Sequence, residues 1–169
     1  MPAAGERPPA GPVCHNGPVT SPESAFEIGT DGPSLILVGI DGSRTSMRAG
    51  AYAAGLARRQ GCRLLVVYVG QLSAGASMSP GAAAFMVESS RQLADELAET
   101  VVGRAAEAGI AAEFRPVSGD PFTELTRIAE QERADAVVVG TSEHAGHRVV
   151  GSLATRLVRA GKWPVIVVP

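Results

Sequence analysis

The chain has 169 residues, of which 45% are hydrophobic, 4% aromatic and 19% charged. This length and composition predict one globular domain with an aliphatic core. A net charge of −2 disfavours a nucleic-acid-binding face, and no apolar run reaches the roughly 18 residues that span a bilayer. Two cysteines, without the apolar segment of a secretory signal near the start, favour a cytoplasmic location.

Residues 1–33 differ in composition from the rest of the chain. Proline and glycine recur throughout this segment, and its apolar content is too low to offset the entropy of ordering. We expect a disordered N-terminal tail over residues 1–33 and a folded domain over residues 34–169.

Apolar runs with the pattern of strands alternate with amphipathic segments of helical spacing from Ser34 onward. The expected strands span residues 35–40, 64–69, 110–117, 135–140 and 164–168. The expected helices include residues 49–57, 83–108, 121–129 and 153–158. This alternation predicts an α/β fold, a three-layer open parallel sheet of five strands with right-handed crossovers. The charges of Glu113 and Arg115 favour a sheet edge for the third strand.

The end of the fourth strand has the pattern of a phosphate cradle. Gly140 follows an apolar strand, and Gly151 with Ser152 opens the next helix, where free backbone N–H groups attract anions. Gly140 would permit a sharp turn, and Gly151 would let a ligand approach the backbone. Two alternatives stay open: both glycines can serve the turns alone, and Ser152 can be only an N-cap.

Residues at two other strand ends can complete the site if the first and fourth strands are neighbours. In such sheets, ligands bind beyond the carboxyl ends of the strands. Asp41 follows the first strand and Val69 ends the second, so together they offer a carboxylate and an apolar slot. Asp41 can also be only an acidic residue that the helix dipole favours.

The ordered set of motifs resembles the universal stress protein family over residues 34–169. The motifs are Ile36-Leu37-Val38-Gly39-Ile40-Asp41-Gly42-Ser43, Gly119-Asp120-Pro121, Ala134-Asp135-Ala136-Val137-Val138-Val139-Gly140, Gly151-Ser152 and Trp163-Pro164-Val165-Ile166-Val167-Val168. The resemblance implies strand order 3-2-1-4-5, a Rossmann-type fold like that of the adenine nucleotide alpha-hydrolases. It also implies a homodimer through the last strand, at Val165, Ile166, Val167 and Val168.

The same resemblance implies a site for ATP or another adenine nucleotide, with Mg²⁺ accompanying ATP. The residues that it places around adenine, ribose and phosphates are Gly39, Ile40, Asp41, Val69, Val139, Gly140, Thr141, Gly151, Ser152 and Leu153.

The phosphate loop departs from the family's pattern. Glu143 occupies the middle glycine position, and the loop between Gly140 and Gly151 is two residues shorter than in the pattern. A carboxylate there would repel a phosphate, whereas His144, His147 and Arg148 would attract one. Triphosphate binding, a smaller or cyclic nucleotide and no nucleotide at all therefore remain alternatives.

Catalytic motifs are lacking in the sequence. It contains no Gly-Lys-Ser/Thr phosphate loop and no Gly-x-Ser-x-Gly nucleophile turn, so we expect a binding protein and not an enzyme. His144 and His147 have no nearby third ligand, which disfavours a metal site.

The preferred hypothesis is a cytosolic stress-response regulator that binds an adenine nucleotide and has an unknown protein partner. The alternative is a nucleotide-free dimeric interaction module of the same fold.

Overall fold

A computed structural model of the chain describes residues 32–70, 80–142 and 151–169. The strands are β1 (Leu35–Ile40), β2 (Arg63–Gly70), β3 (Ala112–Ser118), β4 (Ala136–Gly140) and β5 (Val165–Val168). The helices are α1 (Arg44–Gln60), α2 (Pro80–Glu107), α3 (Pro121–Gln131) and α4 (Ser152–Ala160). The tail expected over residues 1–33 lies almost wholly outside the described residues, so that prediction stays open.

The five strands form one parallel sheet of order β3-β2-β1-β4-β5, which confirms the predicted fold class and strand order. Val38 in the central strand β1 lies between Val66 of β2 and Val138 of β4. The order reverses between β1 and β4, because the chain moves outward to β3 before it returns to the other side of β1. Such a reversal opens a crevice at the carboxyl ends of the two strands.

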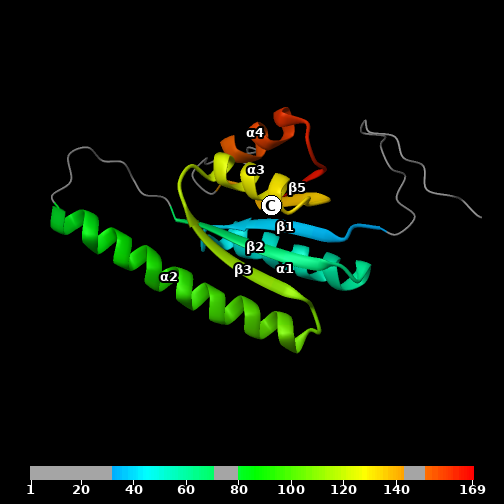
Figure 1. Cartoon of the computed structure of the whole chain (residues 1–169), viewed down its shortest axis with the longest axis horizontal. Coiled ribbons are helices and arrows are strands. Elements are labelled where there is room, and N and C mark those ends of the chain that lie inside the picture. Colours follow the sequence, from blue (N-terminus) through cyan, green and yellow to red (C-terminus); the bar gives the residue numbers. More distant parts are fainter. Residues whose placement is uncertain (1–31, 71–79, 143–150) are drawn as a thin grey trace, which may run out of the picture.

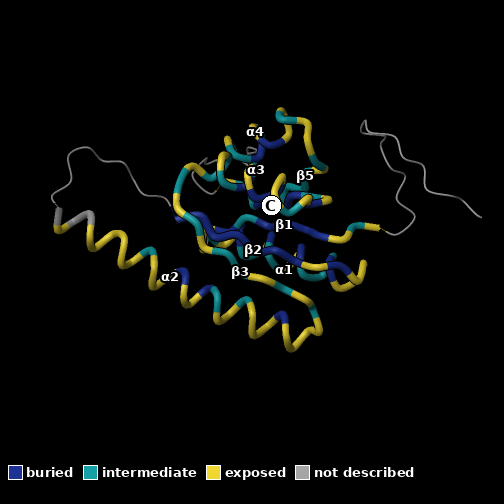
Figure 2. Tube along the Cα trace, in the orientation of Figure 1, coloured by how far each residue is buried: buried dark blue, intermediate teal, exposed yellow. Residues whose placement is uncertain are grey.

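Helices cover both faces of the sheet, α3 and α4 on one and α1 and α2 on the other (Figure 1). Leu35 and Leu37 of β1 enter the core beneath α3 and α4, while Ile36 and Val38 enter the core shared with α1 and α2. This alternation follows from the two-residue period of a strand. Because both faces are covered, β1 and β2 are buried almost throughout (Figure 2).

Two sequence expectations need correction. The third strand begins at Ala112 and not at Ile110, although it lies at the sheet edge as predicted. The expected apolar face of the second helix is only partly buried: Leu97 is buried, whereas Met86 is 38% exposed and Leu93 37% exposed. The reason is that the N-terminal half of α2 extends beyond the sheet that it would have to cover (Figures 1 and 2).

No helix in the described ranges combines the length and the hydropathy that crossing a membrane requires.

Candidate functional site

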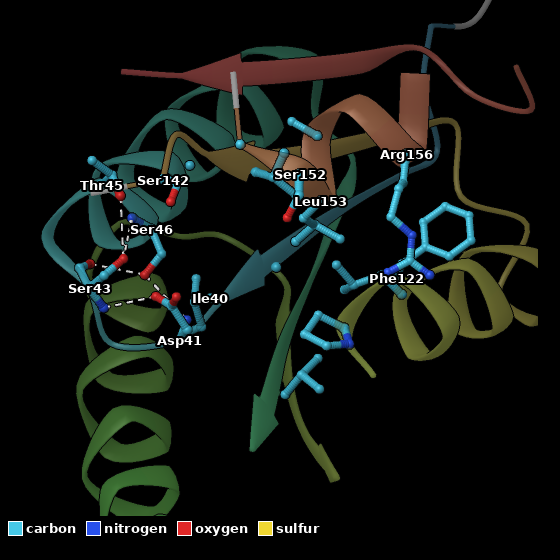
Figure 3. Close-up of a pocket in the computed structure, with 18 of the residues that line it drawn as sticks. Ile40, Asp41, Ser43, Thr45, Ser46, Phe122, Ser142, Ser152, Leu153 and Arg156 are labelled. Carbon is cyan, nitrogen blue, oxygen red and sulfur yellow. Dashed lines mark hydrogen bonds between the residues drawn. The ribbon is translucent and has the colours of Figure 1, made fainter. Parts of the chain in front are cut away.

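A cavity of about 700 Å³ opens at the carboxyl ends of β1 and β4. Its volume falls in the range of about 300–1,000 Å³ that is usual for small-molecule sites. All ten residues predicted for the nucleotide site line this cavity: Gly39, Ile40, Asp41, Val69, Val139, Gly140, Thr141, Gly151, Ser152 and Leu153. Figure 3 shows that Asp41 and Ser43 lie on one flank, Ser152 and Leu153 lie above, and Phe122 and Arg156 lie on the opposite flank.

Asp41 belongs to a hydrogen-bonded turn that leads from β1 into α1. The backbone N–H of Ser43 donates to Oδ1 of Asp41 (2.9 Å), and the backbone N–H of Asp41 donates to Oγ of Ser46 (3.2 Å). Ser43 is the N-cap of α1, since its Oγ accepts from the N–H of Ser46 at 3.2 Å. Asp41 is therefore not the cap of α1, and capping does not account for its carboxylate.

The turn also holds Asp41 in its ionised form. Partial desolvation of the carboxyl group would raise its pKa, but hydrogen bonding to Ser43 and Ser46 outweighs this effect and lowers the pKa below 3.8. At neutral pH the cavity rim thus presents a carboxylate with acceptor capacity for hydroxyl or amino groups of a ligand.

Gly140 is explained by the packing of α1 against the end of β4. A Cβ atom at position 140 would lie 2.7 Å from the backbone nitrogen of Ser46 and 2.7 Å from the carbonyl carbon of Thr45. The Oγ1 of Thr45 donates to the backbone carbonyl of Thr141 at 2.7 Å, which joins the same two segments. Close helix–strand packing therefore requires this glycine, whereas the predicted sharp turn needs no positive φ here.

The first turn of α4 faces the cavity, but Ser152 does not cap it. Gly151 is the N-cap and Ser152 is the first helical residue, which excludes the alternative that Ser152 serves only as the N-cap. A Cβ atom at position 151 would lie 3.0 Å from Cβ of Ser142, so Gly151 permits a close approach of two protein segments. No side chain of the described residues caps this turn, so within the described part of the chain its first N–H groups are available to an anion.

The opposite wall is formed by the start of α3 and one side of α4. Asp120 caps α3 by accepting at Oδ1 from the N–H of Thr123 (3.0 Å), and Pro121 follows it in the first turn, where proline is favoured. Hydrogen bonds from Arg156, and then from Thr123, lower the pKa of Asp120 to about 2. The Arg156 guanidinium lies 4.2 Å from the centroid of the Phe122 ring.

Sequence reasoning missed Phe122 and Arg156 as site residues. Phe122 also packs partly against the core, so an apolar residue here is expected from packing alone. Arg156 had a detectable signal, because it lies four residues after Ser152 and therefore on the same helix face.

The four charged or titratable loop residues named from the sequence, Glu143, His144, His147 and Arg148, lie outside the described residues. Their predicted effects on phosphate binding stay predictions. Within residues 32–70, 80–142 and 151–169, no three His, Cys, Asp or Glu residues come together as a candidate metal site.

These features define a class of protein: an open parallel α/β domain with a ligand-sized cavity where the strand order reverses. The model of the universal stress protein family matches residues 34–169, and the chain belongs to this family. The resemblance inferred from the sequence motifs is thereby confirmed.

Individual relatives agree with this assignment. A universal stress protein of Methanocaldococcus jannaschii is 27% identical over 136 residues, which cover 79% of this chain and 80% of the relative. A solved member of the family from Burkholderia pseudomallei has 29% identity and a TM-score of 0.69, covering 83% of this chain and 98% of the other. A universal stress protein solved in complex with cAMP has 25% identity and a TM-score of 0.63, and the match covers 81% of this chain and 97% of the other.

Proposed function

We propose that this universal stress protein is a cytoplasmic, non-catalytic receptor for an adenine nucleotide, which it binds in the crevice between β1 and β4 to regulate a stress response. The observation that carries the proposal is that the uncapped first turn of α4 and the carboxylate of Asp41 face one cavity from different sides. A similar family member solved with cAMP supports an adenine nucleotide as the ligand.

The cavity offers a different chemical environment to each part of such a ligand. Ile40, Val69 and Val139 supply apolar surface for the base, and Asp41 can accept from ribose hydroxyls. The amides of Ser152 and Leu153, at the start of α4, suit a phosphate. A mononucleotide such as AMP or cAMP is the preferred ligand class, because the phosphate loop is short and contains Glu143. ATP, with Mg²⁺ as its accompanying ion, is the larger alternative.

Two of the hydroxyl groups that line the cavity are already engaged in structural hydrogen bonds, which supports binding over catalysis at these positions. Ser46 donates its Oγ–H to the carbonyl of Ser43 (2.9 Å), and Thr45 donates to the carbonyl of Thr141 (2.7 Å). Both hydroxyls thus hold turns together, whereas an activated nucleophile needs a neighbouring general base.

Titration calorimetry with cAMP, AMP and ATP tests the proposal. We expect at least one of them to bind, and Asp41→Asn to weaken that binding by about tenfold, because a charged acceptor is replaced by a neutral one. The amide oxygen can still accept from Ser43, so the turn should persist. Asp95→Asn on the exposed face of α2 is the control and should bind like the wild type. Absence of binding to all three nucleotides at millimolar concentration would refute the proposal.

The second candidate function is the nucleotide-free interaction module, which the substitution of glycine by Glu143 favours. Mass spectrometry of small molecules released from freshly purified protein separates the two candidates. A co-purifying adenine nucleotide supports the receptor, and its absence together with negative calorimetry supports the module.

A further inference from the structure

An ion pair lies on the cavity wall opposite Asp41. Neither of its residues is among the ligand contacts proposed above. Nη1 of Arg156 lies 3.2 Å from Oδ2 of Asp120, and Nη2 lies 3.2 Å from Oδ1. The guanidinium also lies over the ring of Phe122. Both charged residues line the cavity, so the pair borders the space that a ligand would occupy. Figure 3 shows Arg156 beside Phe122 on this wall.

The charge of Asp120 is not needed for the helix that it caps. The cap is an acceptor oxygen facing the N–H and Oγ–H of Thr123, and asparagine caps helices as well as aspartate does. The negative charge therefore acts mainly on Arg156, whose hydrogen bonds are the largest cause of the lowered pKa of Asp120.

The pair is also easy to open. The side chains of Arg156 and Asp120 are 49% and 47% exposed, and ion pairs of this kind contribute little to stability. Phe122 would keep the guanidinium in place during an exchange of partners, because it contacts the planar group and not the carboxylate. A phosphate can replace the carboxylate, since guanidinium binds both with two parallel hydrogen bonds.

Among the described lining residues, an anionic ligand can gain a cationic side-chain partner only by such an exchange. Among the described residues that line the cavity, Arg156 supplies the only guanidinium or ammonium group, against the carboxylates of Asp41 and Asp120. As long as Asp120 neutralises Arg156, the remaining charge is negative and repels phosphate.

We propose that Asp120 competes with the ligand's phosphate for Arg156, so that this pair determines how strongly the site prefers a nucleotide over its unphosphorylated nucleoside. This inference rests on the proposed function and assigns a specificity role to two residues of the same cavity. Arg156 releases Asp120 when phosphate arrives and pairs with Asp120 when the site holds adenosine alone.

The test compares AMP with adenosine by titration calorimetry on wild type, Asp120→Asn and Arg156→Gln. We expect Asp120→Asn to bind AMP about two- to fivefold more tightly, because the competing charge is gone while the cap remains. Arg156→Gln should bind AMP about tenfold more weakly or worse, because a charge-assisted bidentate contact is lost. Adenosine affinity should change less than twofold in both variants.

Two further variants make the result specific. Arg127→Gln breaks the Arg127–Glu124 pair on α3, which lies outside the cavity lining, and should leave both affinities unchanged. In the double variant Asp120→Asn/Arg156→Gln, the gain from Asp120→Asn should disappear, because no guanidinium remains to be released.

The outcomes separate this inference from the proposed function. If AMP and adenosine bind but neither single variant changes their ratio, the competition is refuted and the receptor stands. If Asp120→Asn raises the affinity for adenosine as much as the affinity for AMP, the competition is also refuted. If neither compound binds to wild type or to Asp120→Asn, the receptor and the competition both fail. Circular dichroism of each variant confirms that it is folded.

Discussion

Gly140 shows how a single backbone position sets the distance between α1 and the sheet beneath the cavity. The nearest atoms to a methyl group at this position would be backbone atoms of Thr45 and Ser46, which cannot rotate away as a flexible side chain can. Any residue larger than glycine must therefore displace the start of α1. The same displacement would move the turn that carries Asp41.

Gly140→Ala should lower the free energy of unfolding by about 1–3 kcal/mol, the usual cost of overpacking a tight site. Gly103→Ala is the matched control, because a Cβ atom in this exposed part of α2 meets nothing within 4 Å. Gly103→Ala should raise the free energy of unfolding by about 0.5–1 kcal/mol, since alanine is the better helix former. Urea denaturation measures both, and equal effects of the two changes would contradict the packing argument.

At the residue scale, the sequence predicted which residues line the cavity better than it predicted why those residue types occur there. The ten predicted site residues line the cavity because strand ends of a parallel sheet share one edge, which is a property of topology. Gly140 and Gly151 were given turn or ligand roles, but each permits two protein segments to approach. Arg156 was missed because its role depends on its ion pair with Asp120, which lies thirty-six residues away along the chain.

Asp135 connects two elements of the sheet through one carboxylate oxygen. Its Oδ2 accepts from the N–H of Ser34 (2.7 Å), the Oγ–H of Ser34 (2.9 Å) and the N–H of Leu35 (2.9 Å). Partial desolvation would raise the pKa of Asp135, but these donors outweigh it and lower the pKa below 3.8. The start of β1 is thereby anchored beside the start of β4.

Asp135→Ala should lower the free energy of unfolding by about 1–2 kcal/mol at neutral pH, a modest value because the group is exposed. A carboxyl group with a lowered folded-state pKa stabilises the protein fully above its unfolded-state pKa and loses that effect as the pH falls further. The wild type should therefore lose stability below a pH of about 4, and the variant should lose less of it there. Denaturation between pH 3 and pH 7 checks this, and parallel curves for the two proteins would contradict it.

Element types were predictable wherever burial was uniform. Buried strands such as β1 and β2 read as continuous apolar runs, and the charges in β3 marked an edge. The burial of α2 was less predictable than its helical type. Phe85 is 73% exposed because the N-terminal half of α2 extends past the sheet, and helical spacing carries no information on where a sheet ends.

At the scale of the whole molecule, β5 ends the sheet with an apolar edge. Among the described residues it pairs only with β4, and Val165, Ile166, Val167 and Val168 are all partly exposed. Unpaired apolar edges favour addition of another strand, and a second copy of the same chain gives a closed two-fold arrangement. We infer a homodimer joined through β5.

Light scattering at tens of micromolar protein should therefore give the mass of a dimer. The melting temperature should also rise with protein concentration, because association stabilises the folded state by mass action. A monomeric mass together with a melting temperature independent of concentration would contradict this arrangement.

The Thr45–Thr141 hydrogen bond joins segments that are ninety-six residues apart along the chain. The cavity is thus assembled from the ends of β1 and β2, from the start of α1 and from the last third of the polypeptide. During synthesis on the ribosome, a chain that has not yet emerged beyond α4 has no complete pocket. The ligand binding that we propose would therefore require that translation of the domain is nearly finished, and a product truncated before α4 would not bind the ligand.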